Sequence, residues 1–220
     1  MLLGLISSDF TVWQNLILIA VFALALLCAI IPHEIAHGYA ALKMGDPSAK
    51  LAGRLSPNPA RHIDPWGLAC FVIMGIGWAK PVPVNPFNFR NFRRGNFWVS
   101  IAGVLTNLVI GFVMSLFLFL VWRFGNIGNV GIFALYYFFG FVVVINITLM
   151  IFNLLPIFPL DGFNVLNSFT KPDNRAMNFI RQYSPFILIS MLLVLMFTGV
   201  LAWARNGIID GFLQFWGLMF

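Results

Sequence analysis

The sequence contains very little charge. Asp, Glu, Lys and Arg make up only 9% of the 220 residues, whereas they make up about 25% of an ordinary soluble domain. Hydrophobic residues make up 60%, so there are too few polar groups to cover a surface in water. This shortage excludes an ordinary soluble protein. We expect one integral membrane domain, covering residues 1–220, that lies in a lipid bilayer.

Cysteine is also scarce. The chain has two cysteines, Cys28 and Cys70, each inside an apolar stretch and neither in a C-x-x-C pair. This pattern gives no indication of a disulfide or a thiolate metal site, and it is typical of small buried hydrophobic residues. Lys and Arg are absent from the first ten residues, which argues against a cleavable signal peptide.

Long apolar runs account for most of the chain. A helix needs about 20 apolar residues to cross a bilayer. Four segments reach that length, which predicts an all-α multi-pass membrane protein with about four transmembrane helices. The first segment continues as a helix to about Met44, and we expect the apolar but interrupted tail Gly207–Phe220 along the membrane interface. The four segments run from about Thr11 to Ile31, Phe97 to Trp122, Gly131 to Phe158 and Pro185 to Ala204.

A fifth apolar stretch, Trp66–Ala79, is about 14 residues long and is too short to cross as a helix. If it enters the bilayer and returns, as a re-entrant segment or a small membrane-embedded β-sheet, all basic residues except Arg123 and Arg205 lie on one side. The net charge of +6 therefore reflects a positive-inside bias. It does not predict nucleic-acid binding, because no basic run has aromatic residues interleaved with it. This bias predicts four spans with both termini outside the cytoplasm.

The end of the first apolar segment carries the motif His-Glu-x-x-His. His33 and His37 are four residues apart, so a helix places both imidazoles on one face, where they can bind one metal ion. The Glu34 carboxylate can take a proton from a water that attacks a carbonyl. A chance match is common in soluble helices, but ionisable side chains in a membrane helix are costly and usually functional. The motif therefore predicts a zinc site with Glu34 as general base.

A catalytic zinc ion of this kind needs a third protein ligand, and Asp161 is the best candidate. It follows two prolines that end the third apolar segment, in the run that starts at Asn153. It precedes Lys171 by about ten residues, which places it on the same side as the histidines and at a similar depth. The alternative is that Asp161 caps a short helix from Gly162 to Phe169.

Several motifs together resemble the site-2 protease family of intramembrane zinc metalloproteases (peptidase M50 type), in its short prokaryotic branch without a PDZ domain. The similarity covers roughly residues 30–170. One departure is Ala102-Gly103-Val104, where the family often has Ala-Gly-Pro; we expect altered packing and intact chemistry there. The motifs are HEIAHG at His33–Gly38, GDPSAK and GRLSPNPARHIDPWG between Gly45 and Gly67, GWAKPVPVNP at Gly77–Pro86, and NLLPIFPLDG at Asn153–Gly162.

The resemblance implies a role for each matching residue. His33, His37 and Asp161 would bind Zn2+. Glu34 would be the general base, and Asn153 would stabilise the oxyanion or hold the substrate strand.

The resemblance also implies a partner and a place. The substrate would be a membrane protein whose single transmembrane helix unwinds easily, cut within or near the bilayer on the cytoplasmic side of the cell membrane. Trp66–Ala79 would pair with the unwound substrate by strand addition. His62 and Asp64 either act on substrate or near the metal, or form a capped loop, and both readings stay open.

Two other functions are compatible with a His-Glu-x-x-His motif in a membrane. A zinc transporter usually has several ionisable groups along a path and often internal repeats, and the sequence has neither. A catalytically inactive homologue that binds membrane substrates would also fit the scaffold, although all the proposed site residues are present.

Overall fold

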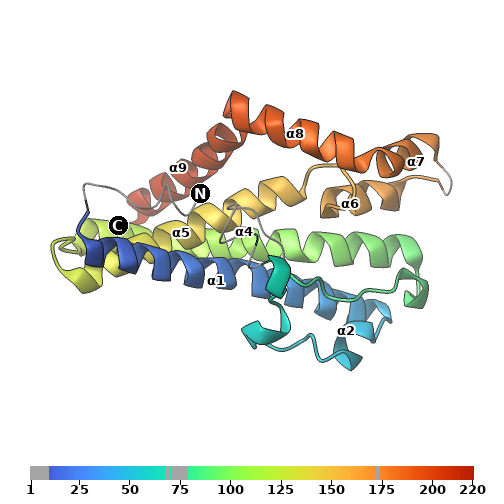
Figure 1. Cartoon of the computed structure of the whole chain (residues 1–220), viewed down its shortest axis with the longest axis horizontal. Helices are drawn as coiled ribbons and strands as arrows, with labels where there is room; N and C mark the ends of the chain where they lie inside the picture. Colours follow the sequence, from blue (N-terminus) through green and yellow to red (C-terminus); the bar gives the residue numbers. More distant parts are fainter. Residues whose placement is uncertain (1–9, 68–69, 71–78, 172–173) are drawn as a thin grey trace.

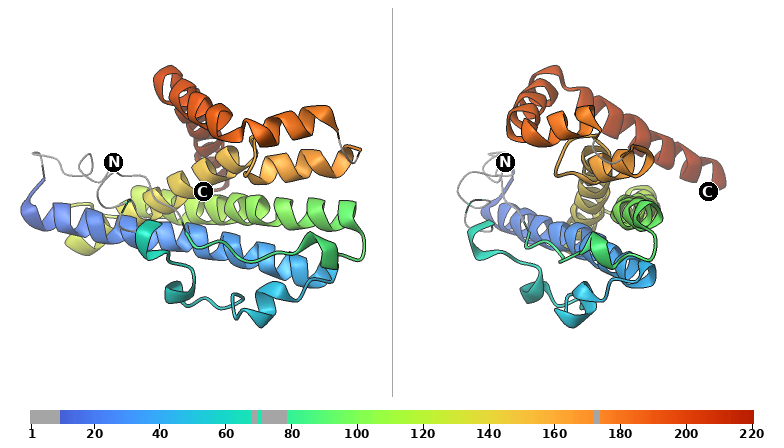
Figure 2. Two further views of the ribbon diagram at one scale, coloured as in Figure 1. Left: turned by 45° about the vertical axis from the view of Figure 1, so that its right-hand side comes forward. Right: turned by 90° about the vertical axis from the view of Figure 1, so that its right-hand side faces the viewer.

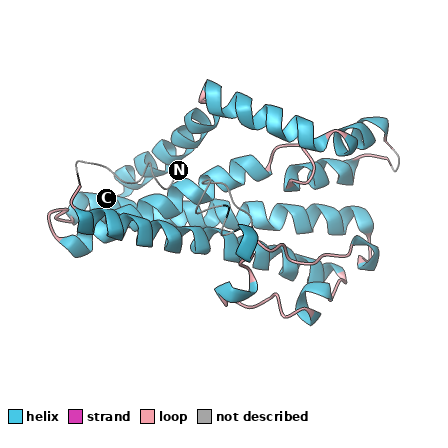
Figure 3. Ribbon diagram, viewed as in Figure 1, coloured by secondary structure: helices cyan, strands magenta, loops and turns pink. Residues whose placement is uncertain are grey.

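The structure is a computed structural model that describes residues 10–67, 70, 79–171 and 174–220. Most of the predicted re-entrant segment Trp66–Ala79 lies outside the described residues. Within them the fold is helical, and Figure 3 draws no strand in that part of the chain. The all-α membrane class predicted from the sequence is confirmed.

Three long helices form the central bundle. They are α1 (Val12–Met44), α4 (Phe92–Phe124) and α5 (Val130–Asn153), and each packs against the other two. Each is long and apolar enough to cross a membrane. Figure 1 and the two views in Figure 2 show α1 and α4 running alongside each other, with α5 against both. The first three predicted spans are therefore present.

Polar residues at the helix ends explain where these helices start and stop. Thr11 forms a capping box with Gln14 at the start of α1. Asn91 and Asn129 accept hydrogen bonds from backbone N–H groups in the first turns of α4 and α5. Gly45 ends α1 in the left-handed conformation, with φ of 112°, which glycine adopts without steric cost.

Small residues allow the three helices to approach closely. Ala25 and Ala29 of α1 are fully buried, and they form one core cluster with Phe22, Val142 and Ile145. Many of the large apolar side chains instead point outwards from the bundle. This inside-out distribution is what a bilayer allows, because lipid tails are as apolar as the side chains that they meet.

The C-terminal part differs from the prediction. The expected fourth span, Pro185–Ala204, is broken at Gly199, whose φ is 66°. This break separates α8 (Ser184–Thr198) from α9 (Val200–Met219). The fourth candidate span is α8 together with α7 (Arg175–Gln182), with a bend of 74° between them. The tail that we expected along the interface forms most of α9, which packs against α4 and α5.

The loop after α1 folds back over that helix and is fastened by Asp46. The Asp46 side chain is fully buried. It accepts hydrogen bonds from the N–H and hydroxyl of Ser48, the N–H of Asn85 and the side-chain amide of Asn88. Asp46 thereby ties the end of α1 to the extended, proline-rich segment Lys80–Pro86, which we call the roof segment.

Asp46 gives the fold a specific dependence on pH. Burial raises the pKa of this carboxyl, but the hydrogen bonds from Ser48, Asn85 and Asn88 outweigh burial, so its pKa lies below the ordinary value of 3.8. The stabilisation is therefore fully present above the ordinary value and is lost as the pH falls through the lower, folded value.

We expect Asp46→Asn to lower the free energy of unfolding by about 2–4 kcal/mol at pH 7. The difference from wild type should narrow as the pH is lowered towards about 3, because the wild-type carboxyl then takes up a proton. Unfolding in detergent micelles measures both effects, with Asp210→Asn on the exposed side of α9 as control. A difference that stays constant with pH would contradict this assignment.

Candidate metal centre

The two histidines of α1 face α4. His33 is buried and His37 is partly buried, and their Nε2 atoms lie 2.9 Å apart. Nδ1 of His37 lies 2.7 Å from the carbonyl oxygen of Val99 on α4. Because a carbonyl can only accept a hydrogen bond, Nδ1 carries the proton in this contact. The lone pair of Nε2 is then free for a metal ion.

A glycine allows α4 to lie this close to the imidazoles. A Cβ atom on Gly103 would lie 2.5 Å from Nε2 of His37 and 2.6 Å from Cε1 of His33. Any larger residue would therefore collide with both rings. The next residue, Val104, is buried in a core cluster with Val143. The departure from the Ala-Gly-Pro pattern thus falls on a packing position, next to the glycine that the site requires.

A sharp turn between α5 and the next helix brings the carboxylate of Asp161 to the two histidines. α5 ends at Asn153, and not at the predicted Phe158, because the prolines that follow cannot continue a helix. The chain then enters α6 (Asp161–Phe169). Gly162 lies directly against the carbonyl of Leu154, so the start of α6 returns to the end of α5.

Asp161 is the first residue of α6, and its side chain does not cap that helix. Its Oδ2 atom lies 3.5 Å from Nε2 of His33 and 3.3 Å from Nε2 of His37. Oδ2 is buried and makes no hydrogen bond to any described residue. The alternative in which Asp161 serves as a helix cap is therefore not what the structure shows.

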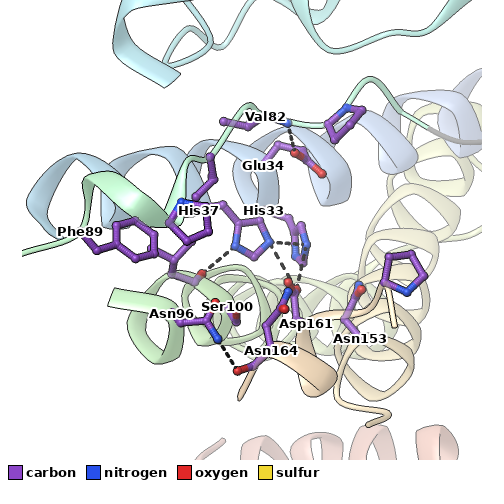
Figure 4. Close-up of a pocket in the computed structure, with 15 residues that line it drawn as sticks. His33, Glu34, His37, Val82, Phe89, Asn96, Ser100, Asn153, Asp161 and Asn164 are labelled. Atoms are coloured by element: carbon purple, nitrogen blue, oxygen red, sulfur yellow. Dashed lines mark hydrogen bonds and ion pairs between the residues drawn. The ribbon is translucent and has the colours of Figure 1, made fainter. Parts of the chain in front are cut away.

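These three atoms have the spacing of a zinc site. Zinc ligands in proteins lie about 2.0–2.2 Å from the ion in a tetrahedron, which puts neighbouring ligand atoms about 3.3–3.6 Å apart. The carboxylate oxygen lies within this range of both imidazoles, at 3.3 and 3.5 Å, and the two imidazole nitrogens lie somewhat closer to each other, at 2.9 Å. Figure 4 shows the three side chains converging from α1 and α6. Within the described ranges, this is the one group of three such side chains close enough to share an ion.

The three side chains lie in a cleft of about 340 Å³, which Glu34 also lines. Oε2 of Glu34 accepts a hydrogen bond of 2.9 Å from the backbone N–H of Val82. Val82 belongs to the roof segment, whose apolar side chains cover one side of the cleft (Figure 4). The structure therefore places the predicted base beside the predicted ligands.

Asn153 is the last residue of α5 and lines the same cleft, close to Asp161 in Figure 4. Its side-chain amide donates to the carbonyl of Leu149 at 3.1 Å. An amide nitrogen carries two hydrogens, so the second one is available to a ligand. The oxyanion role expected of Asn153 is compatible with this position and stays a prediction.

Three polar residues that we did not single out from the sequence also line the cleft. Asn96 of α4 donates to the carbonyl of Asn164 at 2.6 Å, and Asn164 and Ser100 lie on the same wall. The spacing of Asn96 and Ser100, four residues apart on α4, was the available signal. Single polar residues in an apolar helix are usually interhelical contacts, so this spacing alone could not identify them.

His62 and Asp64 do not line the cleft. His62 is 1% exposed, and its Nε2 lies 2.8 Å from the carbonyl oxygen of Ser56. Asp64 accepts hydrogen bonds from the N–H groups of Trp66 and Gly67, both at 2.9 Å. The structure thus shows a capped loop at Asp64. The substrate-binding role of His62 stays a prediction that this position does not support.

Comparisons with known proteins point to the same chemistry. Residues 123–197 match the model of peptidase family M50. A Bacillus subtilis (strain 168) protein named "Putative zinc metalloprotease YwhC" is 36% identical over 188 residues, which cover 84% of this chain and 85% of that protein. Two proteins named "Putative zinc metalloprotease Rip2", from Mycolicibacterium smegmatis and Mycobacterium tuberculosis, are each 29% identical, with 62% of their length covered. The matches cover 74% and 73% of this chain. No solved structure matches the chain.

We expect Gly103→Ala to prevent zinc binding, because the added methyl group would displace both imidazoles. Gly140→Ala is the matched control, since a Cβ there meets nothing closer than 3.9 Å. Metal analysis of the purified proteins should give about one zinc ion per chain for wild type and the control, and a small fraction of that for Gly103→Ala. Full zinc content in Gly103→Ala would show that α4 does not confine the imidazoles.

Proposed function

The chain belongs to peptidase family M50, the site-2 protease type of zinc-dependent metallopeptidases, and on that premise we propose that it hydrolyses peptide bonds within or near the transmembrane segments of other membrane proteins. The observation that carries this proposal is the convergence of His33, His37 and Asp161, with Glu34 beside them, in a cleft between helices long enough to span a membrane.

His33, His37 and Asp161 would hold the zinc ion. When bound there, zinc supplies Lewis-acid chemistry, since it polarises a carbonyl and lowers the pKa of a water molecule. The protein's own part is to fix the ligands. The carbonyl of Val99 holds the ring of His37, and the missing side chain at Gly103 leaves room for both rings.

Glu34 acts as the general base. It takes one proton from the attacking water while the oxygen of that water bonds to the scissile carbonyl carbon. It then gives the proton to the peptide nitrogen as the C–N bond breaks. The products are a new carboxyl terminus and a new amino terminus, and Glu34 returns to its starting state. The free amide hydrogen of Asn153 would donate to the carbonyl oxygen as negative charge develops on it.

The substrate is a membrane protein whose transmembrane helix can unwind. A helix hides its carbonyl carbons, and opening it in lipid leaves several backbone groups unpaired at a cost of several kcal/mol each. The polar wall of the cleft offers hydrogen-bonding partners to such an opened backbone. That wall consists of Asn96, Ser100, Asn153 and Asn164. The reaction takes place near the cytoplasmic side of the cytoplasmic membrane, where the basic loops lie.

A transporter function has less support. A transport path needs several ionisable groups at successive depths. Among the residues that the structure describes, the potential metal ligands gather at one place instead.

We expect Glu34→Gln to reduce cleavage of a single-span model substrate in detergent micelles by at least about 100-fold, because an amide cannot take the proton. Zinc content should stay at the wild-type level, since Glu34 is not a ligand. Cleavage at an undiminished rate would remove Glu34 from the role of base. A loss of zinc would instead assign it to the metal site.

We also expect the stability of the substrate helix to control the rate. In a series of model substrates that differ only in a Gly-Pro pair, a Gly-Ala pair or an Ala-Leu pair near the scissile bond, cleavage should be fastest with Gly-Pro and slowest with Ala-Leu. Quantifying the fragments over time measures this order. Equal rates across the series would contradict a mechanism in which the helix must open.

A further inference from the structure

The Glu34 carboxylate is held by a peptide group that is itself held from its other side. The N–H of the peptide group between Pro81 and Val82 donates to Oε2 of Glu34 at 2.9 Å. The carbonyl oxygen of the same peptide group accepts a hydrogen bond of 3.4 Å from Nη2 of Arg54. One rigid, planar group therefore lies between a guanidinium and the carboxylate.

Arg54 is unusual because it is charged and buried. It is 7% exposed, and its Nη1 atom has no hydrogen-bond partner among the described residues. No described carboxylate forms an ion pair with it. A buried guanidinium without a partner carboxylate is costly. The carbonyl of Pro81 is the contact that the structure provides, and it leads directly to Glu34.

The electrostatics of this arrangement are favourable at both ends. A peptide group carries partial negative charge on its oxygen and partial positive charge on its N–H. The cationic side chain meets the oxygen and the anionic side chain meets the N–H. Each contact polarises the peptide group in the direction that strengthens the other. Arg54 and Glu34 thus act as a charge pair separated by one amide.

The roof segment is fixed at several further points, so this amide cannot easily turn away. Lys80 N–H donates to the carbonyl of His62 at 2.8 Å, and Asn85 N–H donates to Asp46 at 2.7 Å. Pro83 restricts the backbone beside Val82. The Val82 side chain is buried against Gly38 of α1, where an added Cβ would lie 3.3 Å from Cγ1 of Val82.

We propose that Arg54 is a positioning residue for the reaction, acting on the general base Glu34 through the peptide group between Pro81 and Val82. This inference rests on the proposed function. It assigns the N–H of Val82 the task of aiming the Glu34 carboxylate into the cleft, and it assigns Arg54 the task of holding that N–H in place. The competing explanation is that Arg54 only packs the loop after α1.

The first test removes the N–H donor of Val82, and a second valine-to-proline change in the same segment controls for the lost valine side chain. Val82→Pro deletes the N–H in a segment that already alternates with proline, and Val84→Pro makes the same change where the N–H bonds to no described residue. With the single-span model substrate in micelles, Val82→Pro should lower kcat about 10- to 100-fold relative to Val84→Pro. KM and zinc content should stay within about twofold of wild type. Equal kcat values for the two variants would overturn the proposal.

The second test asks whether Arg54 acts through that N–H. Arg54→Met should lower kcat at least about fivefold with unchanged zinc content, and Arg54→Lys should restore part of the loss. Arg61→Met is the control, because exposed Arg61 donates to the carbonyl of Gly53 on the same loop, away from the cleft. It should leave kcat unchanged.

In the Val82→Pro background, Arg54→Met should have no further effect on kcat. Additive losses would show that Arg54 acts by another route and would overturn the proposal. If Val82→Pro does not fold, the comparison of Arg54→Met with Arg61→Met decides alone: equal kcat values refute the proposal. Absence of Glu34-dependent cleavage in the wild-type chain would refute the proposed function itself, which the variants of the roof segment do not test.

Discussion

Two imidazole nitrogens and one carboxylate oxygen meet in the interior of a membrane bundle, and the rest of the structure depends on that meeting. Without a cation between them, Oδ2 of Asp161 would be a buried carboxylate oxygen with no hydrogen bond from any described group, which is costly in an apolar setting. Several local features bring these three atoms together. α4 has no side chain at Gly103, and the chain turns sharply after α5 so that α6 begins with the ligand.

Proteolysis inside a membrane needs a polar cleft in an apolar surrounding. The structure separates these two kinds of surface. Large apolar side chains face outwards from the bundle, while the metal ligands, Glu34 and the amides of Asn96, Asn153 and Asn164 face the cleft. The roof segment closes one side with proline and valine, and Asp46 fastens that segment to the end of α1. The proposed catalytic groups are thus held by backbone contacts on rigid elements, as accurate positioning requires.

Much of this arrangement could be predicted from the sequence, and the exceptions have physical reasons. The three central spans follow from apolar length. His33 and His37 follow from motif spacing, and Asp161 follows from the prolines before it and from its expected depth in the bilayer. The break at Gly199 could not be predicted, because glycine inside an apolar run is equally compatible with a continuous membrane helix. The contact of Arg54 could not be predicted either, because its partner is a backbone carbonyl 27 residues away. Every residue has a backbone carbonyl, so the sequence does not indicate which one accepts the hydrogen bond.

The most direct measurement of the central claim is zinc K-edge X-ray absorption on the purified protein. The account predicts about one zinc ion per chain, with nitrogen and oxygen neighbours at about 2.0–2.2 Å, an imidazole scattering pattern from two rings and no sulfur. Asp161→Ala should lose one oxygen neighbour or the ion itself. A spectrum with a sulfur shell, or a zinc environment that Asp161→Ala leaves unchanged, would contradict a site made from His33, His37 and Asp161.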